Sequence, residues 1–206
     1  HPSRSVNPVR GRMAEQQGTQ ATRSLCDQLQ ITAEELKTRL AFLSFGEQDG
    51  RNLVEIRDVI SSRVDELIGE FYDHLLQFEE LRGILSDPKL MERLKGAQRQ
   101  YLLSLGQLGD DVEYAEGRLR IGLTHERVGI KQKWYLGAYH KLFELILQRL
   151  AVRYSGDAGR LSSLVLTLHK IITFDEIFVV ETYYHATMQR QEDSLCQLKD
   201  AHRQLE

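Results

Sequence analysis

The sequence predicts an all-α protein, and three observations lead to this prediction. Only one proline, Pro88, lies between Val9 and Glu206, so long helices are permitted along almost the whole chain. Apolar residues recur at the three- and four-residue spacing of a helix face. We find neither an internal repeat nor a useful length of the alternating apolar and polar pattern that predicts a strand.

Composition favours a single domain that binds neither nucleic acid nor membrane. The chain has 206 residues, enough for one sizeable core, and its net charge is −3 with both signs interspersed, whereas a nucleic-acid binder shows a basic patch. No apolar run approaches the roughly 18 residues that span a membrane, and no signal peptide is recognisable. Because Cys26 and Cys196 lie far apart, we expect no disulfide and a cytoplasmic location.

The first half of the chain divides into short helices. Thr32, with Glu35 three residues later, predicts a capping box that opens the first helix. A loop is predicted for residues 46–50, which begin and end in glycine. Two helices are then expected over 53–60 and 64–78, where apolar residues follow helical spacing.

The second half contains the longer helices. Residues 81–85 are predicted to form a short turn or helix, and Ser86-Asp87-Pro88 is a strong helix start because proline is favoured in a first turn. Gly109, Asp110 and Asp111 are expected to end that helix and to cap the next one. The remaining predicted helices cover 90–108, a stretch that contains His125, 134–154, and about 157 to beyond 196.

His125 is the main candidate for a functional residue. It lies in an apolar run, between Gly122 and Gly129, which leave room for a large flat group to approach the backbone. A neutral imidazole on an apolar helix face is the iron ligand of globins. The alternative is a core histidine with a backbone partner, which is the commoner role of a lone histidine.

The residues after His125 resemble the F-to-G corner of the globin-coupled sensors, bacterial haem sensors whose globin domain precedes a signalling output domain. The similar motifs are His125, Arg127-Val128-Gly129-Ile130, Lys133-Trp134-Tyr135 and Gly137-Ala138-Tyr139. The resemblance covers roughly Thr32 to Arg190 and implies a globin-like fold with an extra N-terminal helix and a long C-terminal helix. It implies a tail over 1–24, a sensor globin domain over 25–190, and the start of a linker helix to an absent output domain over 191–206. Residues 1–12 look like an expression remnant, since Met13 looks like a natural start.

The same resemblance implies a pocket for haem b, with His125 as the only protein ligand to the iron. Tyr135 would brace the histidine segment, and Tyr72 would donate a hydrogen bond to bound O2. Ala97 falls where some relatives have a hydroxyl residue, so a second distal hydrogen bond is in doubt, and Gln98 is its neighbour. The implied pocket residues are Phe71, Tyr72, Leu94, Ala97, His125, Trp134 and Tyr135; ordinary core packing remains the alternative for Tyr72, Leu94, Ala97 and Tyr135.

These expectations describe a non-enzymatic sensor domain for a diatomic gas, chiefly O2 with CO and NO as further ligands. A homodimer is expected through the last two helices, which have apolar residues on more than one face. Phe143, Leu145, Leu147, Phe174, Ile177 and Val180 are the residues beside the core stripes.

Two other functions stay open at this point. One is a haem-free relative that acts as a stress-signalling scaffold, with a structural His125. The other is an enzyme fragment in which Thr124-His125-Glu126 accepts phosphate in a kinase helix, although Gly129 and the aromatic corner do not suit it.

Overall fold

The computed structural model describes residues 24–108 and 111–203, and within them the regular structure is helical. The predicted tail, apart from Ser24, and the predicted break at Gly109 and Asp110 lie outside the described residues. The helices are α2 (Leu25–Gln28), α3 (Ala33–Phe42), α4 (Glu47–Ser62), α5 (Val64–Leu75), α6 (Glu79–Ile84), α7 (Pro88–Leu103), α8 (Asp111–Arg127), α9 (Gln132–Arg153) and α10 (Ala158–Arg203).

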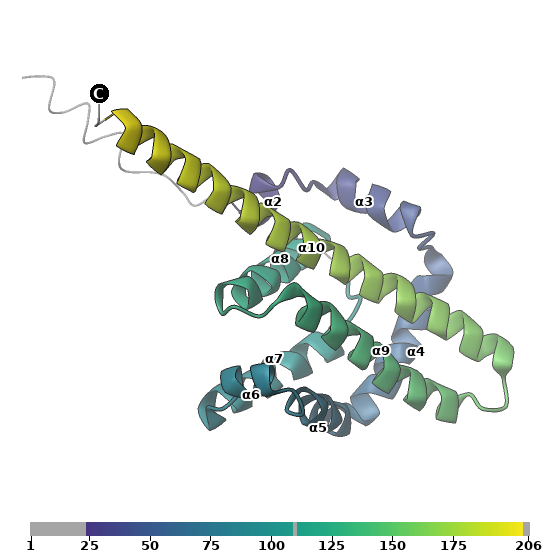
Figure 1. Cartoon of the computed structure of the whole chain (residues 1–206). Coiled ribbons are helices and arrows are strands. Elements are labelled where there is room, and N and C mark those ends of the chain that lie inside the picture. Colours follow the sequence, from purple (N-terminus) through teal and green to yellow (C-terminus); the bar gives the residue numbers. More distant parts are fainter. Residues whose placement is uncertain (1–23, 109–110, 204–206) are drawn as a thin grey trace, which may run out of the picture.

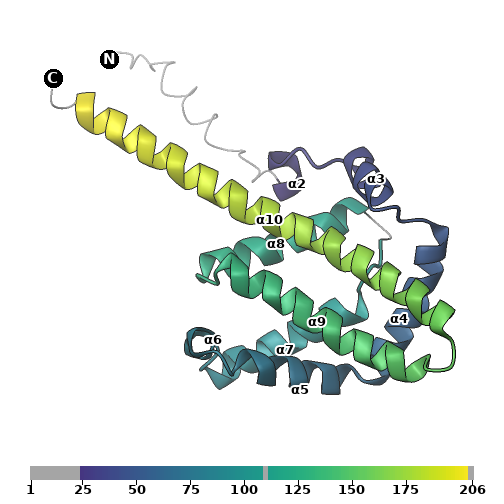
Figure 2. The same cartoon turned by 45° about the vertical axis from the view of Figure 1, so that its right-hand side comes forward.

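The helices form three layers (Figures 1 and 2). α10 runs along one side and packs against α8, α9 and α4, while α5 and α7 pack against each other on the opposite side. α5 also packs on α9, and α7 also packs on α4. The core lies between these layers, and α10 contributes its fully buried Phe174 and Phe178.

Several predicted helix starts are confirmed by their caps. The Thr32 side chain accepts a hydrogen bond from the Glu35 backbone N–H (3.2 Å), and the Asp87 side chain accepts one from the Lys89 backbone N–H (2.9 Å). Pro88 is the first residue of α7, where its missing N–H costs nothing. These caps fix where α3 and α7 begin.

Some predicted boundaries are wrong. Residues 46–50 are not a loop, because Gly46 caps α4 and the helix is continuous through Gly50. Asp49 is buried and accepts hydrogen bonds from the Gly46 N–H and from Thr167 of α10, so tertiary contacts offset the poor helix propensity of glycine. Phe78 does not belong to α5 but caps α6.

The end of α7 also differs from the prediction, because the helix stops at Leu103 instead of continuing to residue 108. Gly106 follows with φ of +66°, and a side chain there would come within 2.5 Å of Leu53. The chain therefore turns at a position that only glycine fits.

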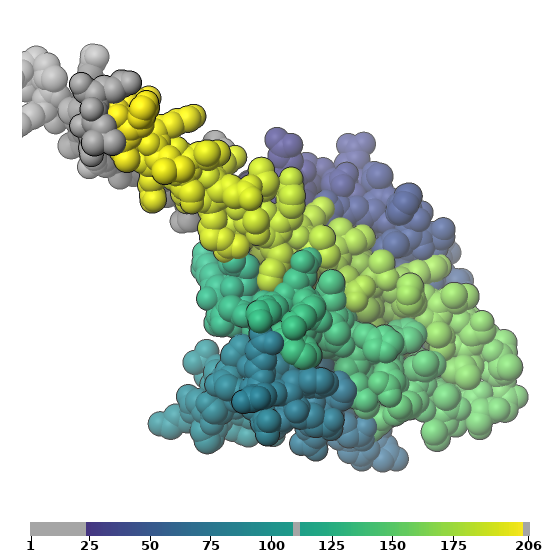
Figure 3. All heavy atoms as spheres, in the orientation of Figure 1, coloured from purple at the N-terminus to yellow at the C-terminus, as the bar shows by residue number. Residues whose placement is uncertain are grey.

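α10 is one unbroken helix of 46 residues. Its last part leaves the body of the molecule, as Figure 3 shows in yellow, and residues 187–203 are exposed on all sides. Among the described helices, none is both long and apolar enough to cross a bilayer.

Candidate functional site

His125 lies near the end of α8 and is half-buried. Its Nδ1 is 2.8 Å from the carbonyl oxygen of Ile121, and a carbonyl can only accept, so Nδ1 carries the proton. Burial lowers the pKa of His125 and favours the neutral ring. The other ring nitrogen, Nε2, then presents a lone pair, which is the arrangement that a metal requires.

The chain leaves α8 through a turn that fixes the histidine segment. Gly129 has φ of +81°, and the Ile130 backbone N–H donates to the His125 carbonyl (3.0 Å). Tyr183 of α10 donates its hydroxyl hydrogen to the Ile130 carbonyl (2.7 Å). The corner between α8 and α9 is thus tied directly to α10.

Tyr135 lies against the imidazole. The two ring centroids are 4.2 Å apart, and Tyr135 is buried at the start of α9. Its ring also contacts Tyr139 and Tyr183. The structure therefore brings Tyr135 and His125 together.

Phe71 and Tyr72 lie side by side on α5, and both are buried. Burial raises the pKa of Tyr72 to about 12, so its phenol stays protonated and able to donate. Among the described residues, no group forms a hydrogen bond with this hydroxyl, although buried polar groups normally have a partner.

α7 supplies the other predicted distal residues, and its packing is incomplete. Leu94 and Gln98 are half-buried and Ala97 is exposed, while Leu102 is the one buried side chain among the described residues of the helix. Ala97 is therefore not gathered into the core with Phe71 and Tyr72. An amphipathic helix with a half-exposed apolar face is consistent with a further apolar group lying against it.

Trp134 is held by α6 and not by His125. Its indole Nε1–H donates to Glu80 (2.8 Å), and its ring lies 5.0 Å from that of Phe78. Lys131 and Lys133 also pair with Glu80. We call Phe78, Glu80, Lys131, Lys133 and Trp134 the corner cluster; it joins the chain after α5 to the start of α9.

Comparison with known proteins gives the family. The family model described as Protoglobin matches residues 32–189, most of the chain. The chain belongs to the protoglobin family. A curated relative, the heme-based aerotactic transducer HemAT of Halobacterium salinarum, is 31% identical over 181 residues, which cover 84% of this chain and 37% of the relative. This protoglobin chain thus spans little more than a third of that relative's length.

Two solved structures confirm the globin-like fold. The globin domain of the Geobacter sulfurreducens globin-coupled sensor superposes with a TM-score of 0.67 at 20% identity and covers 71% of this chain and 96% of its own. The globin domain of E. coli DosC, in a ferric form, gives 0.62 at 13% identity and covers 71% and 97%. The prediction of an all-α, globin-like domain is confirmed.

The residues of this protoglobin chain fit a haem group. His125 offers one neutral nitrogen beside an aromatic wall, and Tyr72 offers a buried hydroxyl that is free to donate. Both are suited to a metal-centred cofactor with a small ligand on its far side.

The sequence reading missed a buried polar cluster. Asp175 of α10 is fully buried and contacts Tyr101 of α7 and both Tyr114 and Arg118 of α8. The signal in the sequence was Asp175 itself, an acidic residue inside an otherwise apolar stretch of α10. A buried charge of this kind requires partners, but the sequence could not say which.

Proposed function

We propose that this chain is a haem-based gas-sensor domain, with O2 as its principal ligand. Haem supplies an iron centre that binds diatomic gases. Membership of the protoglobin family supports this proposal, and the observation that carries it is the state of His125. Its Nδ1 is committed to a backbone carbonyl, so its Nε2 is available to hold the iron.

The other residues have distinct roles in this proposal. Tyr135 orients the imidazole through ring contact, and Tyr72 donates a hydrogen bond to the gas on the opposite side. We infer haem b, bound without covalent attachment, because the sequence has no Cys-x-x-Cys-His motif. Phe71, Leu94 and Trp134 would supply apolar surface, with a lesser part for the exposed Ala97.

The alternatives are less well supported. The burial of His125 against Tyr135 opposes a role as phosphate acceptor, which needs an accessible ring. A haem-free scaffold would have no use for a buried hydroxyl without a partner at Tyr72.

We further propose a cytoplasmic homodimer that regulates an output module following α10. Leu145 and Phe174, expected at the interface, are instead buried within the core of one chain. A different set of exposed apolar residues lies within about 80° of the α10 surface, and we call it the α10 stripe. It consists of Leu166, Val180, Tyr184, Met188, Leu195 and Leu198.

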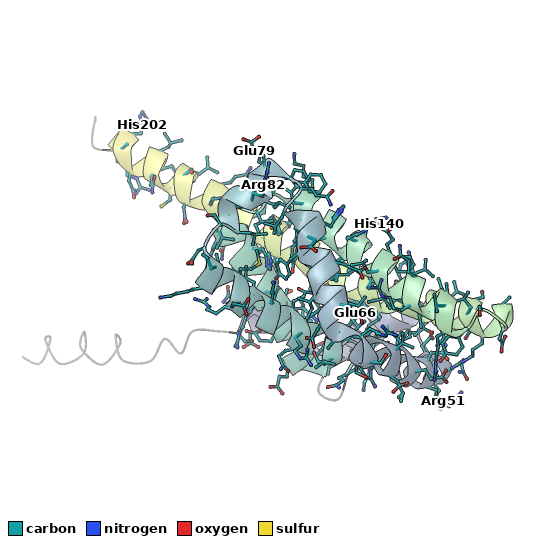
Figure 4. All side chains as sticks on the ribbon, turned by 90° about the horizontal axis from the view of Figure 1, so that it is seen from below. Arg51, Glu66, Glu79, Arg82, His140 and His202 are labelled. Carbon is teal, nitrogen blue, oxygen red and sulfur yellow. The ribbon has the colours of Figure 1, made fainter. Side chains whose placement is uncertain are left out.

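The visible spectrum of the purified protein with added haem tests the main proposal. The parent is expected to show an intense Soret band, and His125→Ala to lose it or retain it weakly while keeping its helical circular dichroism. His140→Ala is the matched control, because His140 projects from the surface of α9 (Figure 4). An unchanged spectrum in His125→Ala would reject His125 as the iron ligand.

A further inference from the structure

A buried ion pair joins three helices at the centre of the molecule. Asp175 of α10 accepts hydrogen bonds from the hydroxyls of Tyr101 (2.9 Å, Oδ2) and Tyr114 (2.7 Å, Oδ1). Arg118 places Nε 3.2 Å from Asp175 Oδ2, and its guanidinium lies between the two tyrosine rings at 4.4 and 4.3 Å from their centroids. One carboxylate thus holds α7 and α8 on α10.

The chemistry of the four groups favours a charged pair. Burial raises the pKa of Asp175, while Arg118 and the two phenols oppose the rise. Burial alone would lower the pKa of Arg118, but the Asp175 charge and the phenols outweigh it and raise that pKa. Burial also raises the pKa of Tyr101 and of Tyr114, so both remain protonated donors. Removing one partner from such a pair leaves an uncompensated buried charge.

The pair shares its helix with the proposed iron ligand. Tyr114, Arg118 and His125 are separated by four and seven residues, so they lie along one face of α8. Between Arg118 and His125 the backbone of α8 touches α10 at Gly122, where an added Cβ would lie 3.0 Å from the Thr182 hydroxyl oxygen. A movement of His125 along α8 therefore meets α10 at the ion pair.

A second line of contacts leads from His125 to the same carboxylate. The rings of His125, Tyr135, Tyr139 and Tyr101 follow one another at 4.2, 5.5 and 6.2 Å. The Tyr101 hydroxyl ends this line on Asp175. Both routes converge on one residue of α10.

We propose that Asp175 and Arg118 are positioning residues that hold the His125-bearing helix on α10 and transmit a displacement of His125 to α10. The coupling half of this proposal rests on the haem function proposed above. The positioning half concerns α8 and α10 alone and can be tested without haem.

Hydrogen–deuterium exchange of the haem-free chain tests the positioning half. In Asp175→Asn, amides of residues 119–127 should exchange about tenfold or more faster than in the parent, as expected for the loss of a hydrogen-bonded buried charge. Asp49→Asn is the matched control, because Asp49 is a buried aspartate that ties α4, and not α8, to α10 through Lys170 and Thr167. In this control the amides near residue 49 should exchange faster and those of 119–127 should not.

Resonance Raman of the haem-loaded chain tests the coupling half. The iron–histidine vibration should shift or broaden in Asp175→Asn and stay as in the parent in Asp49→Asn. If Asp175→Asn does not fold, Tyr114→Phe removes a single donor and should give the same changes at smaller size, while Arg118→Lys should partly preserve the parent behaviour.

The outcomes separate the two proposals. If the parent binds no haem, the proposed function fails, and faster exchange at 119–127 still supports positioning by Asp175. If the parent binds haem through His125 but Asp175→Asn matches Asp49→Asn in both exchange and vibration, the inference is overturned. Faster exchange with an unchanged vibration would overturn the transmission of movement and leave only the anchoring role.

Discussion

Tyr72 and Tyr101 are both buried phenols, yet they differ in what their hydroxyls do. Tyr101 donates to Asp175, whereas no described residue accepts from Tyr72. An unpaired buried hydroxyl costs free energy, and a ligand that accepts its hydrogen bond recovers that cost. The two residues therefore suit different tasks, one structural and one directed at a bound molecule.

Replacing Tyr72 by phenylalanine tests this difference. The change deletes one hydrogen bond worth about 1–3 kcal/mol, so O2 affinity should fall roughly 5- to 150-fold. The loss should appear mainly in the O2 dissociation rate, measured by stopped flow, and CO dissociation should change far less because bound CO has little charge on its outer atom.

Tyr154→Phe provides the control, since Tyr154 hydrogen-bonds Glu55 at the opposite end of α9. Equal O2 dissociation rates for Tyr72→Phe and the parent would remove Tyr72 from the distal site.

The sequence could predict His125 as a candidate and not its surroundings. His125 stands out because it interrupts an apolar run near glycines. The pairing of Arg118 with Asp175 joins residues far apart in the chain and depends on how α8 is aligned on α10. The contact of Trp134 with Glu80 likewise depends on where α6 ends up. Local patterns do not contain that information.

At the scale of elements, local signals predicted helix starts better than helix ends. Thr32 and Asp87 cap their helices through their own side chains, so each start is encoded within a few residues. The start of α4 at Glu47 depends instead on Asp49 meeting Thr167 of α10, and the stop of α7 depends on Gly106 lying against Leu53. Such boundaries are set by tertiary packing.

The corner cluster links α6 to the start of α9, and we expect it to help retain haem. Glu80→Gln removes the charge that pairs with Lys131 and Lys133 and weakens the hydrogen bond from Trp134. Haem transfer to an excess of an acceptor protein should become faster by less than about fivefold, as for other exposed ion pairs.

The effect of Glu80→Gln should shrink in high salt, because salt screens exposed charges. Glu79→Gln is the control, since Glu79 is the preceding residue on α6 and projects outward (Figure 4). The same rate of haem loss in both variants would mean that the cluster only fixes α6.

At the scale of the whole molecule, the α10 stripe predicts a dimer. Val180 is 43% exposed and Tyr184 is 67% exposed, which is high for large apolar side chains on one helix face. Val180→Glu should place a charge in the interface and yield a monomer at micromolar concentration in analytical ultracentrifugation. Val54→Glu, an equally exposed change on α4, should leave the parent's dimer intact.

A parent that sediments as a monomer would contradict the dimer. So would a Val180→Glu variant that remains as tightly associated as Val54→Glu.

The unbroken course of α10 has a consequence for anything that follows it. From Asp175 to Arg203 the helix advances about 42 Å without a break, at 1.5 Å per residue. Each residue also turns the direction of the next by about 100°, so the far end has a fixed azimuth relative to the buried pair. One inserted residue would point every later side chain to a different side, whereas seven would restore the original direction to within about 20°. The spacing after α10 is therefore periodic in its effect, and equal lengths of added helix are not equivalent.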